Sequence, residues 1–360
     1  MAELSLNQRQ YLEFEKIALG AFAPLEGFMN EEEFRGVVED MRLPSGEPFP
    51  LPVVMDLSAD QAQEVTPGRE VVLVFNGVQV GRLVSADLYQ CDKPSVAEKV
   101  FGTSEESHPG VAHFYRMGDH FVGGRVHLER RVTPDFIDYE TTPAETRAHF
   151  RSMGWKTVAG FQTRNVPHRA HEHLQRLALE RCEGLFIQPL VGAKKRGDYL
   201  PNAILTAYGA LVDQFFPANR VFLGVLTTAM RYAGPREAVF HAMIRRNYGC
   251  THFVVGRDHA GVGDYYGKYE AHELTRRFDG ELGITILRFY GPFYCRRCDG
   301  VVTERSCPHV VSMPEVITEI SGTMIRDALA NGREVGRELL RPEIVKSLDG
   351  LKLFIDDDED

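Results

Sequence analysis

The chain has 360 residues, of which 43% are apolar and 26% are charged, a composition typical of a globular protein of two or three domains. Its formal net charge of −10 excludes a general attraction to nucleic acid, so any anion has to be held by a local basic cluster. No run of about 18 apolar residues could span a membrane, and the first residues carry no basic, apolar export signal. We therefore expect a cytoplasmic protein that binds neither nucleic acid nor membranes.

The first part of the chain, residues 1–135, is predicted to be a mixed unit rich in short strands. Two apolar runs flank Asn76-Gly77, the residue pair that a type I′ turn prefers, and this predicts a hairpin. Residues 51–57 form another expected strand. The passage 132–145 is rich in Pro, Asp and Thr, and we interpret it as a linker.

The next part, residues 136–291, alternates apolar segments with amphipathic segments of helical length. The expected strands are 156–161, 185–190, 220–226, 252–256 and 283–287. The expected helices are 170–181, 202–215, 235–248 and 269–278. This alternation predicts an α/β fold with a doubly wound parallel sheet. Residues 292–360 are expected to form a small terminal unit that ends in a solvated acidic tail.

The most informative segment is residues 157–180, where an apolar strand leads into a polar, cationic loop and then a helix. Helix N-termini that follow parallel strands attract phosphate groups, because free amides and the helix dipole favour anions there. Arg164 offers a fork of donors suited to an oxyanion, and Asn165 can cap the helix or bind phosphate. His168 and His171 are three residues apart, so they would face one bound group. Considered alone, they equally fit a packed pair of histidines.

Three further basic loops follow expected strands. Residues 254–263 include three glycines together with Arg257 and His259, residues 229–237 include Arg231, and residues 194–198 are a short charged run. Each loop alone could be a solvated turn. Because the carboxyl ends of parallel strands share one edge of a sheet, we expect all four loops to converge there. Such a rim suits phosphoryl or nucleotidyl transfer, which needs positioning and cationic stabilisation. The chain has no Walker-type phosphate loop, which disfavours a P-loop enzyme.

Three of the six cysteines lie close together in the terminal unit, and a histidine follows the last of them. Cys295, Cys298, Cys307 and His309 offer three thiolates and an imidazole, a complete tetrahedral ligand set for zinc. Disulfides are rare in a cytosolic chain, so we favour a structural zinc site over free thiols.

Long motifs of this chain resemble the ATP sulfurylase family (sulfate adenylyltransferases), specifically the zinc-bearing bacterial and archaeal branch without a kinase domain. The resemblance covers nearly the whole sequence. The motifs are residues 20–29, 108–111, 162–165, 168–171, 230–237, 256–261 and 320–326. It implies a PUA-like domain over residues 1–135, a Rossmann-like catalytic domain over 136–291, and a small zinc-stapled domain over 292–360.

The resemblance also implies a homodimer that acts in sulfate assimilation and converts MgATP and sulfate to adenylyl sulfate (APS) and pyrophosphate. Its cofactors would be Mg²⁺, bound with ATP, and structural zinc. The sulfate contacts that it implies are Gln162, Arg164 and the backbone of Ala260. The implied catalytic residues are Thr163, Arg164, Asn165, His168 and His171. The implied ATP contacts are Gln162, Asn165, His168, His171, Met230, Arg231, Gly256, Arg257, Asp258, His259, Phe289 and Pro292.

Two alternatives stay open at this stage. The nearest one is a nucleotidyltransferase of the same fold that uses another oxyanion, such as selenate or molybdate. The other is a catalytically silent binding protein whose PUA-like part holds RNA, against which the intact Arg/His loops and the acidic net charge both argue. The physiological direction of the reaction, oligomeric state and role of the acidic tail are not determined by the sequence.

Overall fold

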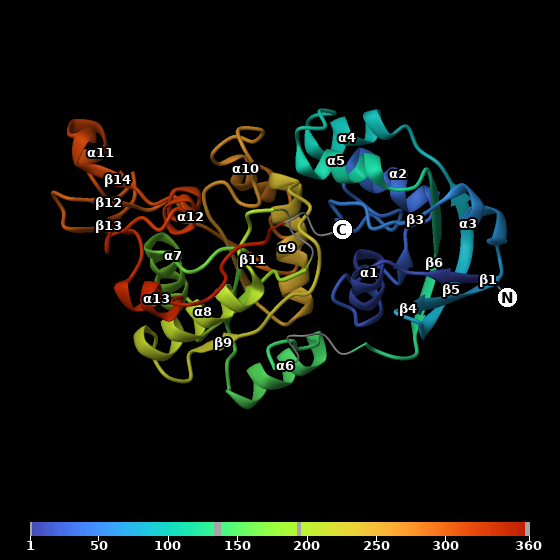
Figure 1. The fold of residues 1–360 in the computed structure, drawn as a ribbon, viewed down its shortest axis with the longest axis horizontal. Coiled ribbons are helices and arrows are strands. Elements are labelled where there is room, and N and C mark those ends of the chain that lie inside the picture. The colour runs from blue at the N-terminus through green and yellow to red at the C-terminus, as the bar shows by residue number, and fades with distance from the viewer. Residues whose placement is uncertain (1, 133–137, 193–195, 357–360) are drawn as a thin grey trace.

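The computed structural model describes residues 2–132, 138–192 and 196–356 (Figure 1). One mixed sheet with its helices forms one side of the molecule, a parallel sheet flanked by helices lies in the middle, and a small unit projects on the far side. Lys194, Lys195 and the end of the acidic tail lie outside these residues, so the structure does not address the expectations for them.

The N-terminal part is built on a six-stranded sheet with the order β1-β4-β5-β6-β2, in which β3 also pairs with β6. Its strands are β1 (Ala2–Ser5), β2 (Gly27–Phe28), β3 (Met55–Leu57), β4 (Glu70–Phe75), β5 (Val78–Tyr89) and β6 (His120–Leu128). Its helices are α1 (Gln8–Ala18), α2 (Glu31–Asp40), α3 (Ala59–Glu64), α4 (Lys93–Phe101) and α5 (Pro109–Arg116). The predicted hairpin is confirmed, with Asn76 at φ 51° and Gly77 at φ 73° between antiparallel β4 and β5. The strand expected over 51–57 is shorter, because only β3 pairs in the sheet.

The central part is a five-stranded parallel sheet with the order β11-β10-β7-β8-β9. Its strands are β7 (Val158–Thr163), β8 (Gly184–Pro189), β9 (Val221–Leu223), β10 (His252–Val255) and β11 (Thr285–Arg288). Its helices are α6 (Pro143–Ser152), α7 (Arg169–Leu179), α8 (Pro201–Phe215), α9 (Gly234–Asn247) and α10 (Glu270–Arg276). The expected doubly wound sheet is confirmed, and the strands and helices differ from the predicted ranges by only a few residues.

The two faces of this sheet pack into different cores. Side chains on one face, such as Ala159 and Ile187, pack with α7 and α8, and α12 and α13 join the same core. Side chains on the other face, such as Val158 and Phe253, pack with α9 and are continuous with the core of the N-terminal part. Apolar residues on both faces explain why these strands are continuous buried runs rather than alternating ones.

The terminal unit consists of a three-stranded sheet with the order β13-β12-β14 and several short helices. Its elements are β12 (Phe293–Cys295), β13 (Gly300–Val302), α11 (His309–Ser312), the 3-10 helix η1 (Pro314–Val316), β14 (Ile317–Glu319), α12 (Gly322–Ala330) and α13 (Pro342–Ser347). The core of the projecting sheet is very small, whereas Ile325 and Ile344 are buried in the central core. Within the described part of the chain, no helix combines the length and apolar character that crossing a membrane requires.

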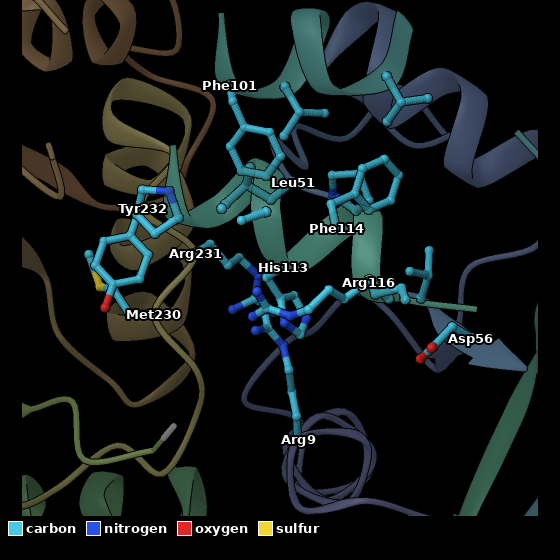
Figure 2. Close-up of a pocket in the computed structure, with 18 of the residues that line it drawn as sticks. Arg9, Leu51, Asp56, Phe101, His113, Phe114, Arg116, Met230, Arg231 and Tyr232 are labelled. Carbon is cyan, nitrogen blue, oxygen red and sulfur yellow. The ribbon is translucent and has the colours of Figure 1, made fainter. Parts of the chain in front are cut away.

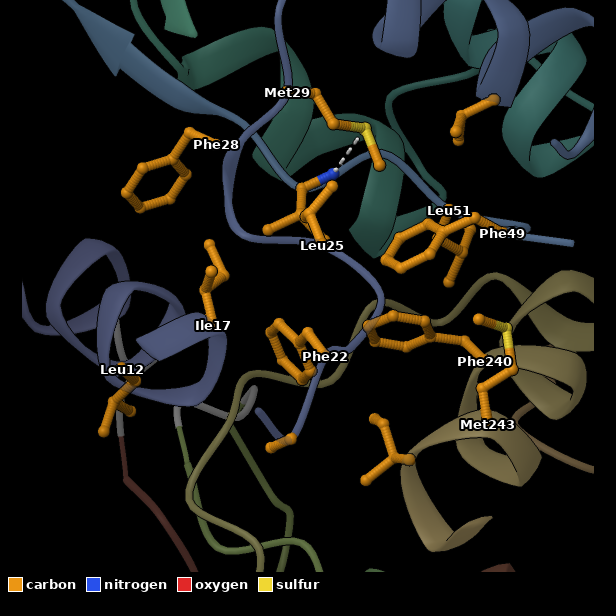
Figure 3. Close-up of a cluster of buried hydrophobic side chains, with 14 of the residues drawn as sticks. Leu12, Ile17, Phe22, Leu25, Phe28, Met29, Phe49, Leu51, Phe240 and Met243 are labelled. Carbon is orange, nitrogen blue, oxygen red and sulfur yellow. Dashed lines mark hydrogen bonds between the residues drawn. The ribbon is translucent and has the colours of Figure 1, made fainter. Parts of the chain in front are cut away.

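Aromatic side chains join the N-terminal and central parts (Figure 3). Phe240 of α9 lies 5.1 Å from the ring of Phe22 and 5.7 Å from that of Phe49, measured between centroids. It is 1% exposed. Because both neighbours come from the N-terminal part, the packing of these rings fixes the central sheet against that part.

We predict that Phe240→Ala lowers the free energy of unfolding by about 3–5 kcal/mol, because it leaves a cavity among rings from both parts. Urea denaturation followed by circular dichroism measures the change. Val311→Ala removes an 87% exposed side chain and serves as the control, with an expected change within about 0.5 kcal/mol. A loss at Phe240 as small as that of the control would contradict the assignment.

Candidate active site

The candidate site lies where the strand order of the central sheet reverses. The chain leaves β7 toward β8 and β9 on one side, and later returns to place β10 and β11 on the other. Strands β7 and β10 are therefore neighbours whose following loops part in opposite directions. Ligands of doubly wound proteins bind in the crevice that such a switch point opens beyond the carboxyl ends of the strands.

The loops that follow β7 and β10 are in direct contact. Arg164 Nη2 donates a hydrogen bond of 3.1 Å to the carbonyl of Gly261. Its guanidinium also lies 4.9 Å above the centre of the Tyr232 ring, a cation–π arrangement. Thr163 Oγ1 accepts a hydrogen bond of 3.1 Å from the amide of Asn165, which shapes the turn. Three of the basic loops expected at one rim therefore meet there, and Arg164 touches the other two.

Two donors at this rim are buried without an acceptor among the described residues: Gln162 Nε2 and Arg164 Nη1. The two residues are two apart at the end of a strand, so their side chains leave the same face. A buried charged donor without an acceptor destabilises the folded protein by about 1–3 kcal/mol or more, unless a ligand accepts its hydrogen bond. The geometry therefore points to a small anion between them.

Two histidines form a stacked pair at the start of α7. Their ring centroids are 3.7 Å apart, and His168 Nδ1 accepts a hydrogen bond of 3.2 Å from the amide of His171 as the helix N-cap. This bond assigns the proton of neutral His168 to Nε2, which can donate to a ligand. Burial, with a smaller contribution from Arg257, lowers the pKa of His168 to about 4. Burial and then His168 hold the pKa of His171 well below its usual range, so both rings are neutral at pH 7.

The loop after β10 is held in an unusual backbone conformation. Asp258 and Ala260 both have positive φ, 53° and 56°, which non-glycine residues rarely adopt. Gly261 follows, and a Cβ atom there would lie only 2.0 Å from Asp258 Oδ1, so a side chain at this position would displace the Asp258 carboxylate. Strained backbone of this kind concentrates at binding sites, where amides are turned toward a ligand.

The residues expected to contact the nucleotide lie beside this loop. The amide of Phe289 donates a hydrogen bond of 3.0 Å to the carbonyl of Val255. A Cβ atom on Gly291 would approach Arg257 Cδ to 2.7 Å, so the segment that leads to buried Pro292 lies against the Arg257 side chain. Residues 289–292 and the start of the 256–261 loop are therefore neighbours, as the resemblance requires. Their roles stay predictions.

Two predicted contacts point elsewhere. The Arg231 guanidinium forms a buried ion pair with Glu13 of α1 rather than facing the rim. The imidazole of His259 faces inward, with Nε2 at 3.2 Å from Nδ1 of buried His241, so a nucleotide contact from His259 would have to come from its backbone. Both groups turn away because a polar partner lies behind them in the interior. Met230 is also buried, and it packs with Tyr232.

Sequence reasoning gave no role to Arg326, although it lies in one of the quoted motifs. Its Nη2 donates a hydrogen bond of 2.8 Å to Asn165 Oδ1, and its Nη1 lies 3.1 Å from Oδ1 of buried Asp198. Asp198 also accepts a hydrogen bond of 3.1 Å from the Tyr232 hydroxyl. Together with Tyr232 beneath Arg164, these contacts form a chain of positioning groups around the rim.

The comparisons with known proteins agree with this geometry. An ATP-sulfurylase family model matches residues 137–350, and a PUA-like domain model matches residues 1–131. This chain belongs to the ATP sulfurylase family. It is 44% identical to the sulfate adenylyltransferase of Halothermothrix orenii, over 97% of this chain and 91% of that relative. It is also 44% identical to the sulfate adenylyltransferase of Aeropyrum pernix, over 97% of this chain and 90% of the other.

A solved structure described as a hexameric APS kinase from Thiobacillus denitrificans shares the fold with a TM-score of 0.75. The alignment covers 97% of this chain and 62% of that one, at 22% identity. This likeness supports the fold of the ATP sulfurylase chain as a whole.

The cysteine and histidine cluster of this chain has the geometry of a tetrahedral metal site. His309 Nδ1 lies 3.5, 3.3 and 3.7 Å from the sulfur atoms of Cys295, Cys298 and Cys307 respectively, and the last two sulfurs are 3.8 Å apart. All four ligand atoms lie within 4.8 Å of one another. Ligands at about 2.3 Å (sulfur) and 2.0 Å (nitrogen) from one zinc ion would be about 3.5–3.8 Å apart. The donor set therefore fits zinc.

We predict that His168→Asn makes folding less sensitive to acid. Protonation of His168 is favoured in the unfolded chain, with a pKa of about 6.5, over the folded one, with a pKa of about 4, so stability falls as the pH drops through this window. Between pH 7.5 and pH 5 the native protein should lose about 2 kcal/mol more than the variant, whose Asn keeps an N-cap. Urea denaturation at both pH values measures this difference, and equal losses would contradict a buried neutral His168.

Proposed function

We propose that this chain is a sulfate adenylyltransferase, which joins sulfate to the α-phosphate of ATP and releases pyrophosphate. The observation that carries the proposal is the pair of buried donors, Gln162 Nε2 and Arg164 Nη1, at the switch point of a doubly wound sheet. A small oxyanion beside a nucleotide site would satisfy both. The sulfate adenylyltransferases that share 41–45% of its sequence over nearly its full length support the same reaction.

The chemistry needs positioning rather than a base. Sulfate has no proton to lose at neutral pH, so one of its oxygens attacks the α-phosphorus directly, in line with the departing pyrophosphate. The difficulty is electrostatic, because a pair of unit charges at 4 Å repel by about 4 kcal/mol at an effective dielectric of about 20. Gln162, Arg164 and the turned amide of Ala260 would hold the sulfate and offset this repulsion.

The paired histidines would serve the leaving group. Because His168 is neutral, its Nε2–H is a dipolar donor that can bind a β- or γ-phosphate oxygen without repelling Arg257. The negative charge that develops on pyrophosphate would then be stabilised by His168, His171 and the N-terminus of α7. Thr163 and Asn165 would fix the loop that presents them.

The nucleotide would lie along the loop after β10. We propose that Gly256, Arg257 and Asp258, with Phe289 and Pro292 beside them, contact the adenosine side of ATP, and that Met230 packs behind. Mg²⁺ would enter on the triphosphate, since proteins usually bind it through phosphates and water. A homodimer and a cytoplasmic role in sulfate assimilation are proposals from the family resemblance.

Zinc would hold the projecting sheet together. Among the described residues, the hydrophobic core of this sheet has three buried members, Phe293, Cys295 and Cys307. These are too few to stabilise three short strands. With all four positions filled by protein ligands, such a metal has no place for substrate and is structural.

We predict that Arg164→Ala lowers kcat by at least about 1,000-fold, because the variant loses both the sulfate contact and the charge offset. Pyrophosphate release that requires both ATP and sulfate is the assay. Arg181→Ala, at an exposed position near the opposite edge of the sheet, is the matched control and should keep native turnover. Near-native release by Arg164→Ala, or release from the native protein without sulfate, would refute the proposed function.

We predict one tightly bound zinc ion per chain, which Cys298→Ser should remove or weaken by breaking the tetrahedral set. Metal analysis by mass spectrometry after dialysis measures the stoichiometry. Cys91→Ser, far from the cluster in sequence and absent from it, is the control. Undiminished zinc in Cys298→Ser would rule out this ligand.

A further inference from the structure

A cavity lies between the N-terminal and central parts of the molecule, beside the aromatic packing that joins them (Figure 2). Its volume is about 840 Å³, within the range of sites for small organic ligands. It is lined by α1, α4 and α5 on one side, and on the other by the loop that precedes α9 and by residues 262–265 of the loop after β10. The residues that hold the predicted sulfate, Gln162 and Arg164, do not line it.

Four basic side chains converge in this cavity: Arg9 from α1, His113 and Arg116 from α5, and Arg231 from the loop before α9. The three arginines all lie close enough to His113 to disfavour its protonation, and burial together with these charges lowers the pKa of His113 to about 3. His113 is thus neutral at pH 7, and its Nε2 is buried without a hydrogen-bond partner among the described residues.

The charges in the cavity are only partly balanced. Glu13 pairs with Arg231 and accepts a hydrogen bond from Thr228. Asp56 is occupied by Gln10 and by the amide of Gly118. Arg9 makes no hydrogen bond or ion pair with any residue that the structure describes. Burial and Arg231 lower its pKa only to about 10, so Arg9 is charged at neutral pH.

We propose that this cavity is a second anion-binding site, next to the catalytic rim but distinct from the predicted sulfate position, which takes a tetrahedral oxyanion such as the phosphate or sulfate group of an ester. Arg9, Arg116 and Arg231 would bind the oxyanion through charge-assisted hydrogen bonds, and the neutral imidazole of His113 would add a donor. Opposite them the wall is apolar, with Val100, Phe101 and Phe114. The combination of a basic end and an aromatic wall favours an ester with an apolar body over a free inorganic ion.

The site is placed to communicate with catalysis. Tyr232 lines the cavity, and its ring also lies beneath the Arg164 guanidinium. On either side of Tyr232, the amides of Arg231 and Ala233 both donate hydrogen bonds of 2.9 Å to buried Glu237, so one carboxylate holds both neighbours of Tyr232. A ligand that separates Arg231 from Glu13 would displace the neighbouring Tyr232, whose ring lies against the Arg164 guanidinium.

Direct binding tests the proposal without relying on turnover. Isothermal titration calorimetry of the full chain would use phenyl phosphate and inorganic phosphate as probes, in an Arg164→Ala background that removes the main oxyanion contact of the rim. Arg9→Gln and Arg116→Gln should each weaken binding about 10- to 100-fold, as expected for loss of a charged hydrogen bond. Arg9→Lys should restore part of it. Arg35→Gln removes an arginine that is 68% exposed and should leave binding unchanged.

The outcomes separate the possible sources of the anion. If phenyl phosphate binds more tightly than inorganic phosphate, the ligand is an ester with an apolar body. If the two probes bind equally tightly, the cavity is a site for a free oxyanion. Arg116 is exposed, so its variant is not expected to unfold, and thermal melting checks the Arg9 variants. Binding unchanged by both Arg9→Gln and Arg116→Gln, or no binding of either probe at millimolar concentration, would overturn the proposal.

Discussion

The site depends on one constraint: Arg164 lies directly after β7 with its Nη1 buried and only part of its donor set satisfied inside the protein. A guanidinium cannot lose its proton, so burial is tolerable only if oxygen atoms or aromatic faces surround it. The protein supplies the carbonyl of Gly261 and the ring of Tyr232. The remaining donor is left for a ligand, which makes the resting site complementary to an anion before any substrate arrives.

This constraint explains why loops far apart in sequence must meet. Gly261 reaches Arg164 only if β10 is the neighbour of β7, and the reversal of strand order at β7 makes this so. Arg326 of the terminal unit lies 161 residues beyond Asn165 in the sequence. It donates a hydrogen bond to Asn165 and forms an ion pair with Asp198, and so links the terminal unit to the site. The small terminal unit is thus part of the site's architecture as well as the part that carries the cysteine and histidine cluster.

The strands, helices and basic loops of the central part could be predicted from sequence because their signals are local. Apolar runs, helix-length segments and glycine turns each depend on near neighbours, and parallel strands bring their carboxyl ends to one edge. Side-chain direction depends on partners that local patterns do not contain. Arg231 turns toward Glu13, 218 residues earlier, and His259 turns toward His241 in another helix. The role of Arg326 and the cavity beside Arg9 are long-range in the same sense.

Neutral histidines are consistent with this crowded cationic rim. A protonated His168 would stand stacked on His171 and near Arg257, adding a further positive charge to a rim that already holds several arginines. Burial prevents that cost by keeping both imidazoles uncharged until an anion arrives. Fixed charge is therefore left to the arginines, and the histidines contribute oriented N–H dipoles.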